Sequence, residues 1–546
     1  MASDSGPSAP AARLQLLPLG VPVVFFLVEC YRYSRLIRFP ESTLIQYVPD
    51  DAFYYLVLGK NFSTLHRWTF DGTAPATGFH LLWGYYIALI YQIVPNISFH
   101  QMFTFLFFTG SALMTLGLAV TSLLAMRRIG RFALLGPIAM FFGYWGFNQP
   151  NYLMESSLVI FFVSLTLYLI FGRDKVVTRR VLIGAFVAGV LGMLSRSDFG
   201  LVPLVCLVAL AIETPLRRTL RAALGKEWSY EGSARRAVAA CALSGSVLGL
   251  GLVAGHTYLV SGRFVQSSAR EKRHWSQLEG NPKKSSVIFA AKMLRPYLPP
   301  PLPPDLARRQ SRKDSVLFLL LFGLAALGAA TAKNTTETRI VMVGASLVVV
   351  VGYIFLYRYD TEALQPWYFA NFLVPCSLLF GAAVSSPGIP WKTFSFAWIL
   401  LWLYASMHVL LETSWPAQIG FYEGGNYIAR HPEIKPVGAW NAGIESFYAN
   451  GGVVDLDGLV NDDILSYSLA NNLPEYLRQR HITHIVDDTI MLHADGLQRR
   501  GGYPGTTLTQ CVNSEVRIWW RPVFTNGGDR VTVSELNPAC LGAATH

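Results

Sequence analysis

The sequence predicts an α-helical polytopic membrane protein with a small α/β domain at its C-terminus. Of the 546 residues, 52% are hydrophobic and only 14% are charged, and many apolar stretches approach the roughly 20 residues that a helix needs to cross a bilayer. Short clusters of Lys and Arg separate several of these stretches, as in the cytoplasmic loops of membrane proteins. After residue 412 the sequence turns polar, and short apolar runs alternate with turn residues, which is typical of a small α/β unit.

The apolar stretches predict about eleven transmembrane helices within a domain at residues 14–412. Residues 1–13 are small and polar, so we expect them to be disordered on the cytoplasmic side. The first apolar stretch is too long for a removed signal peptide and lacks a cleavage site. The expected spans are 14–37, 101–126, 132–147, 152–171, 181–194, 199–212, 237–260, 316–331, 340–357, 367–383 and 394–411.

One apolar segment, Leu81–Ile93, is expected to lie flat at the membrane surface. It has about 13 residues and is rich in Trp and Tyr, which are enriched at the membrane–water interface. If it crossed the membrane, the later short loops rich in Lys and Arg would all lie outside, against the usual bias towards the cytoplasm. The flat orientation places these loops and the N-terminus in the cytoplasm, and the C-terminal domain at 413–546 outside.

The first outer loop, residues 38–100, carries an acidic pair. Asp50 and Asp51 follow Pro49 directly, and His80 lies further along the same loop. Carboxylates beside a bilayer are costly to keep there, so their default interpretation is functional. The alternative is that the pair only caps the helix that follows Pro49.

The second long outer loop, residues 261–314, is strongly basic, with twelve Lys or Arg residues. Long loops cross the membrane despite their charge, so the predicted topology holds. Arg270 and Lys272 in this loop suit the phosphate of an anionic lipid headgroup. The alternative is a basic surface helix that binds ordinary anionic phospholipid. The net charge of +11 therefore indicates membrane lipid rather than nucleic acid.

Further polar and aromatic residues fall at the outer ends of the expected spans. Each has a local explanation: a carboxylate at a helix start, an ion pair, or an aromatic belt with a snorkelling Arg. Because the predicted topology brings all of them to one face, we expect a shared site. These residues are Glu155, Arg196, Asp198, Arg358, Trp367 and Tyr368.

The C-terminal domain is expected to contain strands at 437–440, 452–456, 483–486 and 516–523, and a helix at 462–480. Cys511 and Cys540 could pair if this domain faces an oxidising compartment. The acidic run at 453–462 suits a cation or sugar hydroxyls, but its spacing does not match an EF-hand loop, so Asx turns explain it better. The sequence has no P-loop, GxGxxG, HExxH or paired CxxC motif, so nucleotide chemistry and structural zinc are unsupported.

The chain resembles the GT-C superfamily of integral-membrane glycosyltransferases, in particular bacterial members that use polyprenyl-phosphate-linked sugars. The resemblance rests on Asp50–Asp51 and on TGFHLLW at 77–83, LMESSL at 153–158, SRSDFG at 195–200, QPWYF at 365–369 and DLDGLVND at 455–462. It implies juxtamembrane helices in the first outer loop, and sugar transfer to a glycan, lipid or protein acceptor at the outer face of the bacterial cytoplasmic membrane. The predicted role is in cell-envelope glycan biosynthesis.

The resemblance also implies roles for the candidate residues. Transfer with inversion needs a carboxylate as general base, for which Asp50 is the first choice and Asp51 the second. The pair also offers ligands for a divalent cation, Mg²⁺ or Mn²⁺, whose use the sequence leaves open. We expect Arg270, Lys272 and Arg358 at the donor phosphate, and His80, Glu155, Arg196, Asp198, Trp367 and Tyr368 around the substrates.

Two other functions remain open from the sequence. A transporter or flippase of lipid-linked sugars would also have many spans, but it should carry ionisable residues near their centres, and the expected spans are nearly free of charge. A non-catalytic carbohydrate-binding or assembly protein would explain the C-terminal domain. It would leave the acidic pair and the basic loop together unexplained.

Overall fold

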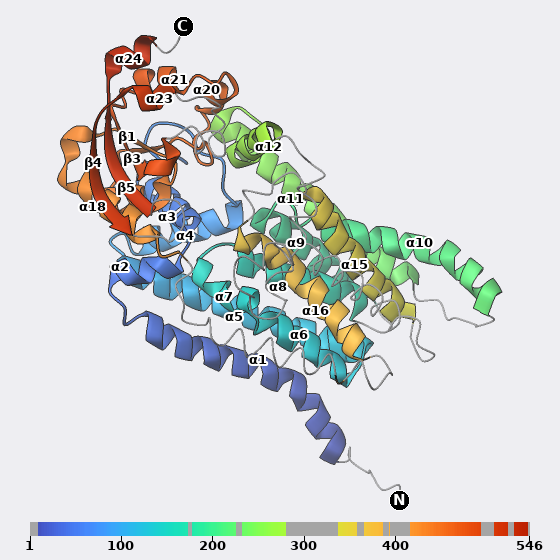
Figure 1. The fold of residues 1–546 in the computed structure, drawn as a ribbon. Helices are drawn as coiled ribbons and strands as arrows, with labels where there is room; N and C mark the ends of the chain where they lie inside the picture. The colour runs from blue at the N-terminus through green and yellow to red at the C-terminus, as the bar shows by residue number, and fades with distance from the viewer. Residues whose placement is uncertain are drawn as a thin grey trace, which may run out of the picture.

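The computed structural model describes residues 9–172, 177–224, 232–279, 337–357, 365–385, 393, 415–492, 507–521 and 529–543. Across these residues the chain is mostly helical, with one five-stranded sheet near the C-terminus. The helices run as a bundle, and the sheet sits at one end of it (Figure 1). Two expected spans, 316–331 and 394–411, and the candidate Arg358 lie outside the described residues.

The bundle is held by a core of buried apolar side chains contributed by most of its helices. Among the described residues, four helices are long and apolar enough to cross a membrane: Phe99–Arg128, Ser233–Ser261, Thr338–Leu356 and Trp367–Val384. Their length and composition agree with a polytopic membrane protein, and the count of eleven spans stays a prediction. The bundle helices are α1 (Ala9–Leu36), α5 (Phe99–Arg128), α6 (Leu135–Phe141), α7 (Tyr144–Asn148), α8 (Ser156–Phe171), α9 (Arg179–Ser195), α10 (Leu201–Leu224), α11 (Gly232–Ser261), α15 (Glu337–Leu356) and α16 (Ala370–Val384).

The span expected at 132–147 is not one continuous helix. A 3-10 turn at Arg131–Leu134 leads into the short α6, and α7 begins only after a break before Tyr144. In α6, a Cβ at Gly136 would lie 2.1 Å from the carbonyl oxygen of Ser377 in α16. The two backbones approach so closely that only glycine fits there. The segment expected as one straight helix is thus two short helices, of which α6 packs closely on α16.

The first outer loop folds into helices that join the bundle to the sheet. It contains α2 (Glu41–Leu44), α3 (Asp50–Leu65) and α4 (Leu81–Ile93), and α3 packs against α4. At about 1.5 Å per residue, the 13 residues of α4 reach roughly 20 Å, which is short of a bilayer core. The length agrees with the expected juxtamembrane helix, while its orientation to a membrane stays a prediction.

The C-terminal region, described from residue 415 onwards, is built on a sheet with the strand order β2-β1-β3-β5-β4. β1 (Val437–Ala439) pairs in parallel with β2 (Val453–Asp455) and β3 (His484–Asp488), and β5 (Asp529–Leu536) runs antiparallel to β3 and β4 (Val512–Arg521). All four expected strands overlap observed ones, while β5 was missed. The expected helix at 462–480 is two helices, α20 (Leu465–Leu469) and α21 (Leu473–Gln479).

The C-terminal region packs on the first outer loop through α18 (Gln418–Arg430) and α19 (Ala442–Ala449). Buried side chains of α3, α4 and the sheet belong to one apolar core; the rings of Phe53 and Phe447, for example, lie 5.5 Å apart. Cys511 and Cys540 form a disulfide. The loops that follow β1 and β2 therefore lie against the start of α3, at the strand ends where open α/β sheets usually bind ligands.

Candidate active site

A cavity of about 850 Å³ lies where the bundle, the first outer loop, α12 (Ser267–Glu279) and the C-terminal region meet. Its walls come from segments far apart in the sequence, including the loop before α4, the start of α8, the loop after α9 and the ends of α15 and α16. Eight of the eleven candidate residues line it: Asp51, His80, Glu155, Arg196, Asp198, Lys272, Trp367 and Tyr368.

The two adjacent aspartates point to different partners. α3 begins at Asp50, and successive helix positions are rotated by about 100°. The Asp50 carboxylate accepts hydrogen bonds from the backbone N–H groups of Ile444 (2.7 Å) and Gly443 (3.2 Å), which begin α19. Asp51 lines the cavity, whereas Asp50 does not. The expected cap on α3 is therefore not found: α3 begins without a side-chain cap bond, and Asp50 instead binds the start of α19.

The contact with α19 changes the acidity of Asp50. Burial between α3 and α19 raises the pKa of its carboxyl to about 7, although the N–H bonds from Ile444 and Gly443 lower it. An unfolded aspartate has a pKa near 3.9, so the folded protein holds this proton more tightly. The carboxyl therefore contributes stability that is complete below about pH 4 and is lost as the pH rises to about 7.

Asp50→Asn is expected to remove this pH-dependent loss, because the amide carries no charge at any pH. Its single oxygen keeps the shorter bond from Ile444 and gives up the bond from Gly443, a cost that does not change with pH. In detergent, the thermal unfolding midpoint of the wild type should therefore fall relative to that of the variant between pH 4 and pH 8. Glu515→Gln, on the exposed face of β4, is the control and should follow the wild type throughout. A wild-type-to-Asp50→Asn difference that is constant with pH would contradict the assignment.

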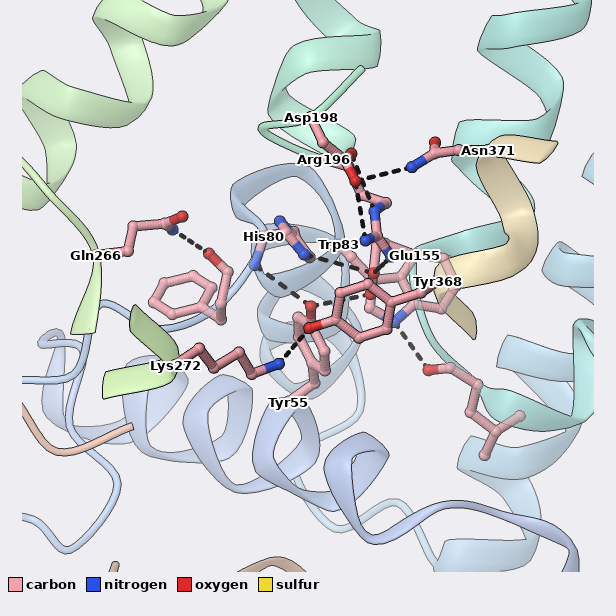
Figure 2. A network of polar contacts seen from close by, with 12 residues as sticks. Tyr55, His80, Trp83, Glu155, Arg196, Asp198, Gln266, Lys272, Tyr368 and Asn371 are labelled. Carbon is pink, nitrogen blue, oxygen red and sulfur yellow. Dashed lines mark hydrogen bonds and ion pairs between the residues drawn. The ribbon is translucent and has the colours of Figure 1, made fainter. Parts of the chain in front are cut away.

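Glu155 lies at the centre of a buried polar network on the cavity wall (Figure 2). Its side chain is 1% exposed. One carboxylate oxygen accepts a hydrogen bond of 2.9 Å from the hydroxyl of Tyr55. The other oxygen lies 3.3 Å from Nη1 of Arg196 and 3.5 Å from Nε2 of His80. Burial lowers the pKa of His80 more than Glu155 raises it, so the imidazole is neutral at neutral pH and offers one donor and one acceptor.

Arg196 also holds Asp198 in a two-bond ion pair. Nε and Nη2 of Arg196 lie 3.2 and 3.1 Å from the two oxygens of Asp198. The same carboxylate accepts hydrogen bonds from Tyr357 and from the Asn371 amide at 2.8 Å (Figure 2). Burial raises the pKa of Asp198, but Arg196 and the Tyr357 hydroxyl lower it further, to below its usual value. This carboxylate is therefore ionised and fully engaged.

Two cations of the cavity wall, Lys272 and Arg196, contact the side chain of Tyr368. Nζ of Lys272 donates a hydrogen bond to the Tyr368 hydroxyl and lies 4.8 Å from its ring centre, while Cζ of Arg196 lies 4.6 Å from the same ring centre. Arg273 of α12 also lines the cavity. Arg270 does not line it, because its guanidinium pairs with Asp462 of the C-terminal region. The basic loop thus contributes Lys272 and Arg273 to the site.

The acidic pair does not fit a divalent cation. Within the described residues, no three His, Cys, Asp or Glu side chains converge as a metal site requires. Asp50 is moreover turned towards the N–H groups of α19, whereas Asp51 lines the cavity, so the two carboxylates are not offered to one ion. In the acidic run of the C-terminal region, Asp455 and Asp457 accept hydrogen bonds from nearby backbone N–H groups. The Asx-turn interpretation accounts for these two residues.

Several residues that line the cavity were not among the predicted site residues. Tyr54 and Tyr55 lie one helical turn after Asp51 in α3, and this spacing was an available signal. Arg273 stands in the basic loop beside a chosen candidate. Leu459 and Val460 come from the acidic run of the C-terminal region, and nothing in their apolar chemistry distinguishes them from core residues.

No protein-family model matches the chain, and no curated protein matches it by sequence. Solved structures do resemble it. An oligosaccharyltransferase of Archaeoglobus fulgidus in its apo form has a TM-score of 0.50 and 13% identity, over 89% of this chain and 71% of that one. The oligosaccharyltransferase AglB from the same organism, in complex with an inhibitory peptide and dolichol-phosphate, has a TM-score of 0.47, 13% identity and the same coverage. ArnT from Cupriavidus metallidurans has a TM-score of 0.40 and 12% identity, over 97% of this chain and 99% of that one. At such identities the likeness concerns the fold.

Proposed function

We propose that this chain, whose fold resembles that of an archaeal oligosaccharyltransferase, is a membrane glycosyltransferase of the GT-C superfamily and transfers a sugar from a polyprenyl-phosphate donor to an acceptor. The reaction takes place at the outer face of a bacterial cytoplasmic membrane and inverts the anomeric centre. The acceptor is a glycan, a lipid or a protein. The disulfide between Cys511 and Cys540 supports a C-terminal region outside the cytoplasm, because such bonds persist in oxidising compartments.

One observation carries the proposal: a single cavity is lined by the carboxylate of Asp51 and by the cations Lys272 and Arg273. Sugar transfer from a phosphate donor needs both kinds of group, a base for the acceptor hydroxyl and positive charge for the departing phosphate. At about 850 Å³, the cavity has the size of a typical small-molecule site. The sequence analysis placed Asp50 first as the base, and the geometry favours Asp51.

The proposed reaction is one displacement. The acceptor hydroxyl oxygen attacks the anomeric carbon of the donor while Asp51 takes the hydroxyl proton. The new bond joins the acceptor oxygen to the anomeric carbon, and the bond between that carbon and the phosphate oxygen breaks. Its electron pair leaves with the polyprenyl phosphate. Because attack and departure occur on opposite faces of the sugar, the configuration inverts.

Lys272 and Arg273 stabilise the negative charge that grows on the departing phosphate. The hydrogen bond and ring contact with Tyr368 keep the Lys272 ammonium at the cavity wall. Arg196 is already held by Glu155 and Asp198, so its main part is to fix these two carboxylates. Arg196 thus offsets part of the negative charge of the two carboxylates, which leaves this group of three residues with one net negative charge.

The remaining wall suits a sugar ring. Tyr54, Tyr55 and Trp367 present aromatic surface to the cavity, on which the apolar face of a sugar packs. The neutral imidazole of His80 supplies a donor and an acceptor for sugar hydroxyls. His80 is held near Glu155 and follows Phe79, whose carbonyl oxygen accepts a 2.6 Å hydrogen bond from Gln266. This anchoring gives the imidazole a defined place.

The proposal is tested by sugar transfer in proteoliposomes with a panel of radiolabelled polyprenyl-phosphate sugars. Wild-type protein should form product with at least one donor. Lys272→Met should raise the donor KM about tenfold, as expected for the loss of one charge-assisted hydrogen bond to phosphate. The control is Lys60→Met on α3, whose Nζ contacts Asn450 (3.3 Å) outside the cavity.

Wild-type protein that forms no product with any donor, but moves lipid-linked sugar between the leaflets, would replace the transferase with the transporter. A donor KM that Lys272→Met leaves unchanged would remove Lys272 from the phosphate site. Lys60→Met should match the wild type in either case.

A further inference from the structure

We propose that Asp462 of the C-terminal region is a positioning residue for the donor phosphate, which it serves by holding α12 through Arg270. The inference rests on the proposed function for the identity of the ligand. In this role the C-terminal region determines the position of Lys272, although Lys272 belongs to α12.

The helix α12 presents different residues to the cavity and to the C-terminal region. Ser268, Ala269, Lys272 and Arg273 line the cavity. Arg270 pairs instead with Asp462, although it lies only two positions from Lys272. Two helix positions correspond to a rotation of about 200°, so the two cations leave α12 on nearly opposite sides. Whatever holds the Arg270 side therefore sets where Lys272 stands in the cavity.

Asp462 is the point at which three segments meet. Its side chain is 2% exposed, and one carboxylate oxygen forms the ion pair with Arg270. The other oxygen accepts a 2.6 Å hydrogen bond from the hydroxyl of Thr77. The backbone N–H of Asp462 donates to the carbonyl of Pro75 at 3.0 Å. One buried carboxylate thus joins the C-terminal region, the first outer loop and α12.

The start of α12 is held by the same loop. The backbone N–H of Ser267 donates to the Thr77 hydroxyl at 3.0 Å, and the Ser267 hydroxyl donates to the carbonyl of Leu459 at 2.8 Å. A Cβ at Gly78 would lie 1.6 Å from that carbonyl oxygen, so the loop and the C-terminal region are in direct backbone contact. These bonds fix the first turn of α12. The orientation of the residues that follow depends on side-chain contacts.

A second contact lies beside Arg270. Glu271 is fully buried, and one of its oxygens accepts a 3.1 Å hydrogen bond from Ser468 of α20. A Cβ at Gly458 would lie 2.7 Å from Cγ of Glu271. Two consecutive residues of α12 are therefore bound by the C-terminal region, and the charged contact, which is the stronger kind of hydrogen bond, is the one made by Asp462.

Small displacements matter at such a site. A shift of about 1 Å in a positioning group costs a reaction of this kind as much as a hundredfold. Without the negative charge of Asp462, α12 keeps its first-turn bonds but loses its strongest contact beyond them. We expect Lys272 then to sit less well against Tyr368 and against a bound phosphate, so that donor binding weakens while the base at Asp51 is untouched.

A double-mutant cycle tests this role. Asp462→Asn keeps an acceptor for Thr77 and removes the charge; it should raise the donor KM and the Kd for radiolabelled polyprenyl phosphate about tenfold, with kcat within about twofold. Lys272→Met should weaken binding at least as much. In the double variant, the fold-increase in the donor Kd should be smaller than the product of the two single-variant increases, because Asp462 acts through Lys272. If Asp462→Asn does not fold, Arg270→Gln takes its place in the cycle.

A second readout does not depend on the ligand. Hydrogen–deuterium exchange of Ser267–Glu279 in the full-length protein should rise in Asp462→Asn, and should not rise in Asp463→Asn, the exposed neighbour. The positioning role would be overturned if the two substitutions weakened donor binding independently, so that their fold-effects on Kd multiplied in the double variant. Unchanged hydrogen–deuterium exchange of α12 in Asp462→Asn would overturn it as well. Wild-type protein that binds no polyprenyl phosphate, together with faster exchange in Asp462→Asn, would instead reject the proposed donor and leave the positioning of α12 standing.

Discussion

Asp51→Asn is expected to lower the kcat of sugar transfer by about 10²- to 10⁴-fold, the usual contribution of a general base. The amide has the shape of the carboxylate but cannot take the acceptor proton. Because Asp51 lines the cavity, and asparagine has nearly the size and shape of aspartate, we expect the variant to fold. The measurement is single-turnover transfer in proteoliposomes at matched protein amounts.

Binding of the donor should persist in Asp51→Asn, because the proposal assigns the phosphate to Lys272 and Arg273 of α12 and not to Asp51. Asp463→Asn is the matched control, since it removes an exposed carboxylate of the C-terminal region, and it should transfer sugar like the wild type. Asp50→Asn should also keep most of its transfer activity. Full activity in Asp51→Asn would contradict the role of Asp51 as the base. Loss of activity in Asp50→Asn at unchanged stability would identify Asp50 as the base instead.

Arg196→Met is expected to cost about 3–5 kcal/mol of stability, because it leaves two buried carboxylates without their partner. Arg196 is 3% exposed and lies within 3.3 Å of both Glu155 and Asp198. The guanidinium also packs against the Tyr368 ring. The thermal unfolding midpoint of the purified protein in detergent measures the effect.

Neutralising the whole cluster distinguishes charge from packing. Arg196→Met combined with Glu155→Gln and Asp198→Asn should recover a large part of the lost stability, because it leaves no uncompensated charge. Arg430→Met, at an exposed position of α18, is the control and should unfold like the wild type. A triple variant no more stable than Arg196→Met alone would show that the packing of the guanidinium, and not its charge, stabilises this wall.

The buried cluster explains how the fold supports a polar site beside a membrane. Glu155, Arg196 and Asp198 pair with one another and bind Tyr55, Tyr357 and Asn371, so their side chains are held in place on the cavity wall. Asp51, His80, Lys272 and Arg273 line the same cavity and are the groups to which the proposal gives roles towards the substrates. Polar groups held in place in advance are what electrostatic catalysis requires.

Much of this arrangement could be predicted from the sequence. The class of protein follows from composition, because long apolar stretches in a chain with 14% charged residues have no stable place in water. The candidate residues were found for a related reason: polar groups at the ends of apolar stretches gather on a membrane face. Eight of the eleven indeed line one cavity.

The continuous helix expected at 132–147 shows the limit of composition. Apolar content predicts burial, but it does not report the close backbone contact at Gly136 that accompanies the broken path into α6 and α7. The missed strand β5 is a different case, because its sequence, DRVTVSEL, alternates apolar and polar residues and includes β-branched Val and Thr. This is a local strand signal that was available from the sequence.

The sequence by itself determined the class, the apolar segments and the polar groups from which a site could be built. Only the tertiary structure decided between neighbours: Asp50 meets α19 while Asp51 lines the cavity, and Arg270 meets Asp462 while Lys272 lines the cavity. In both pairs the residue types are alike, and what differs is their rotation about a helix axis. The direction in which a helical residue points is known only once the elements packed around the helix are known. Here these elements come from parts of the chain hundreds of residues away.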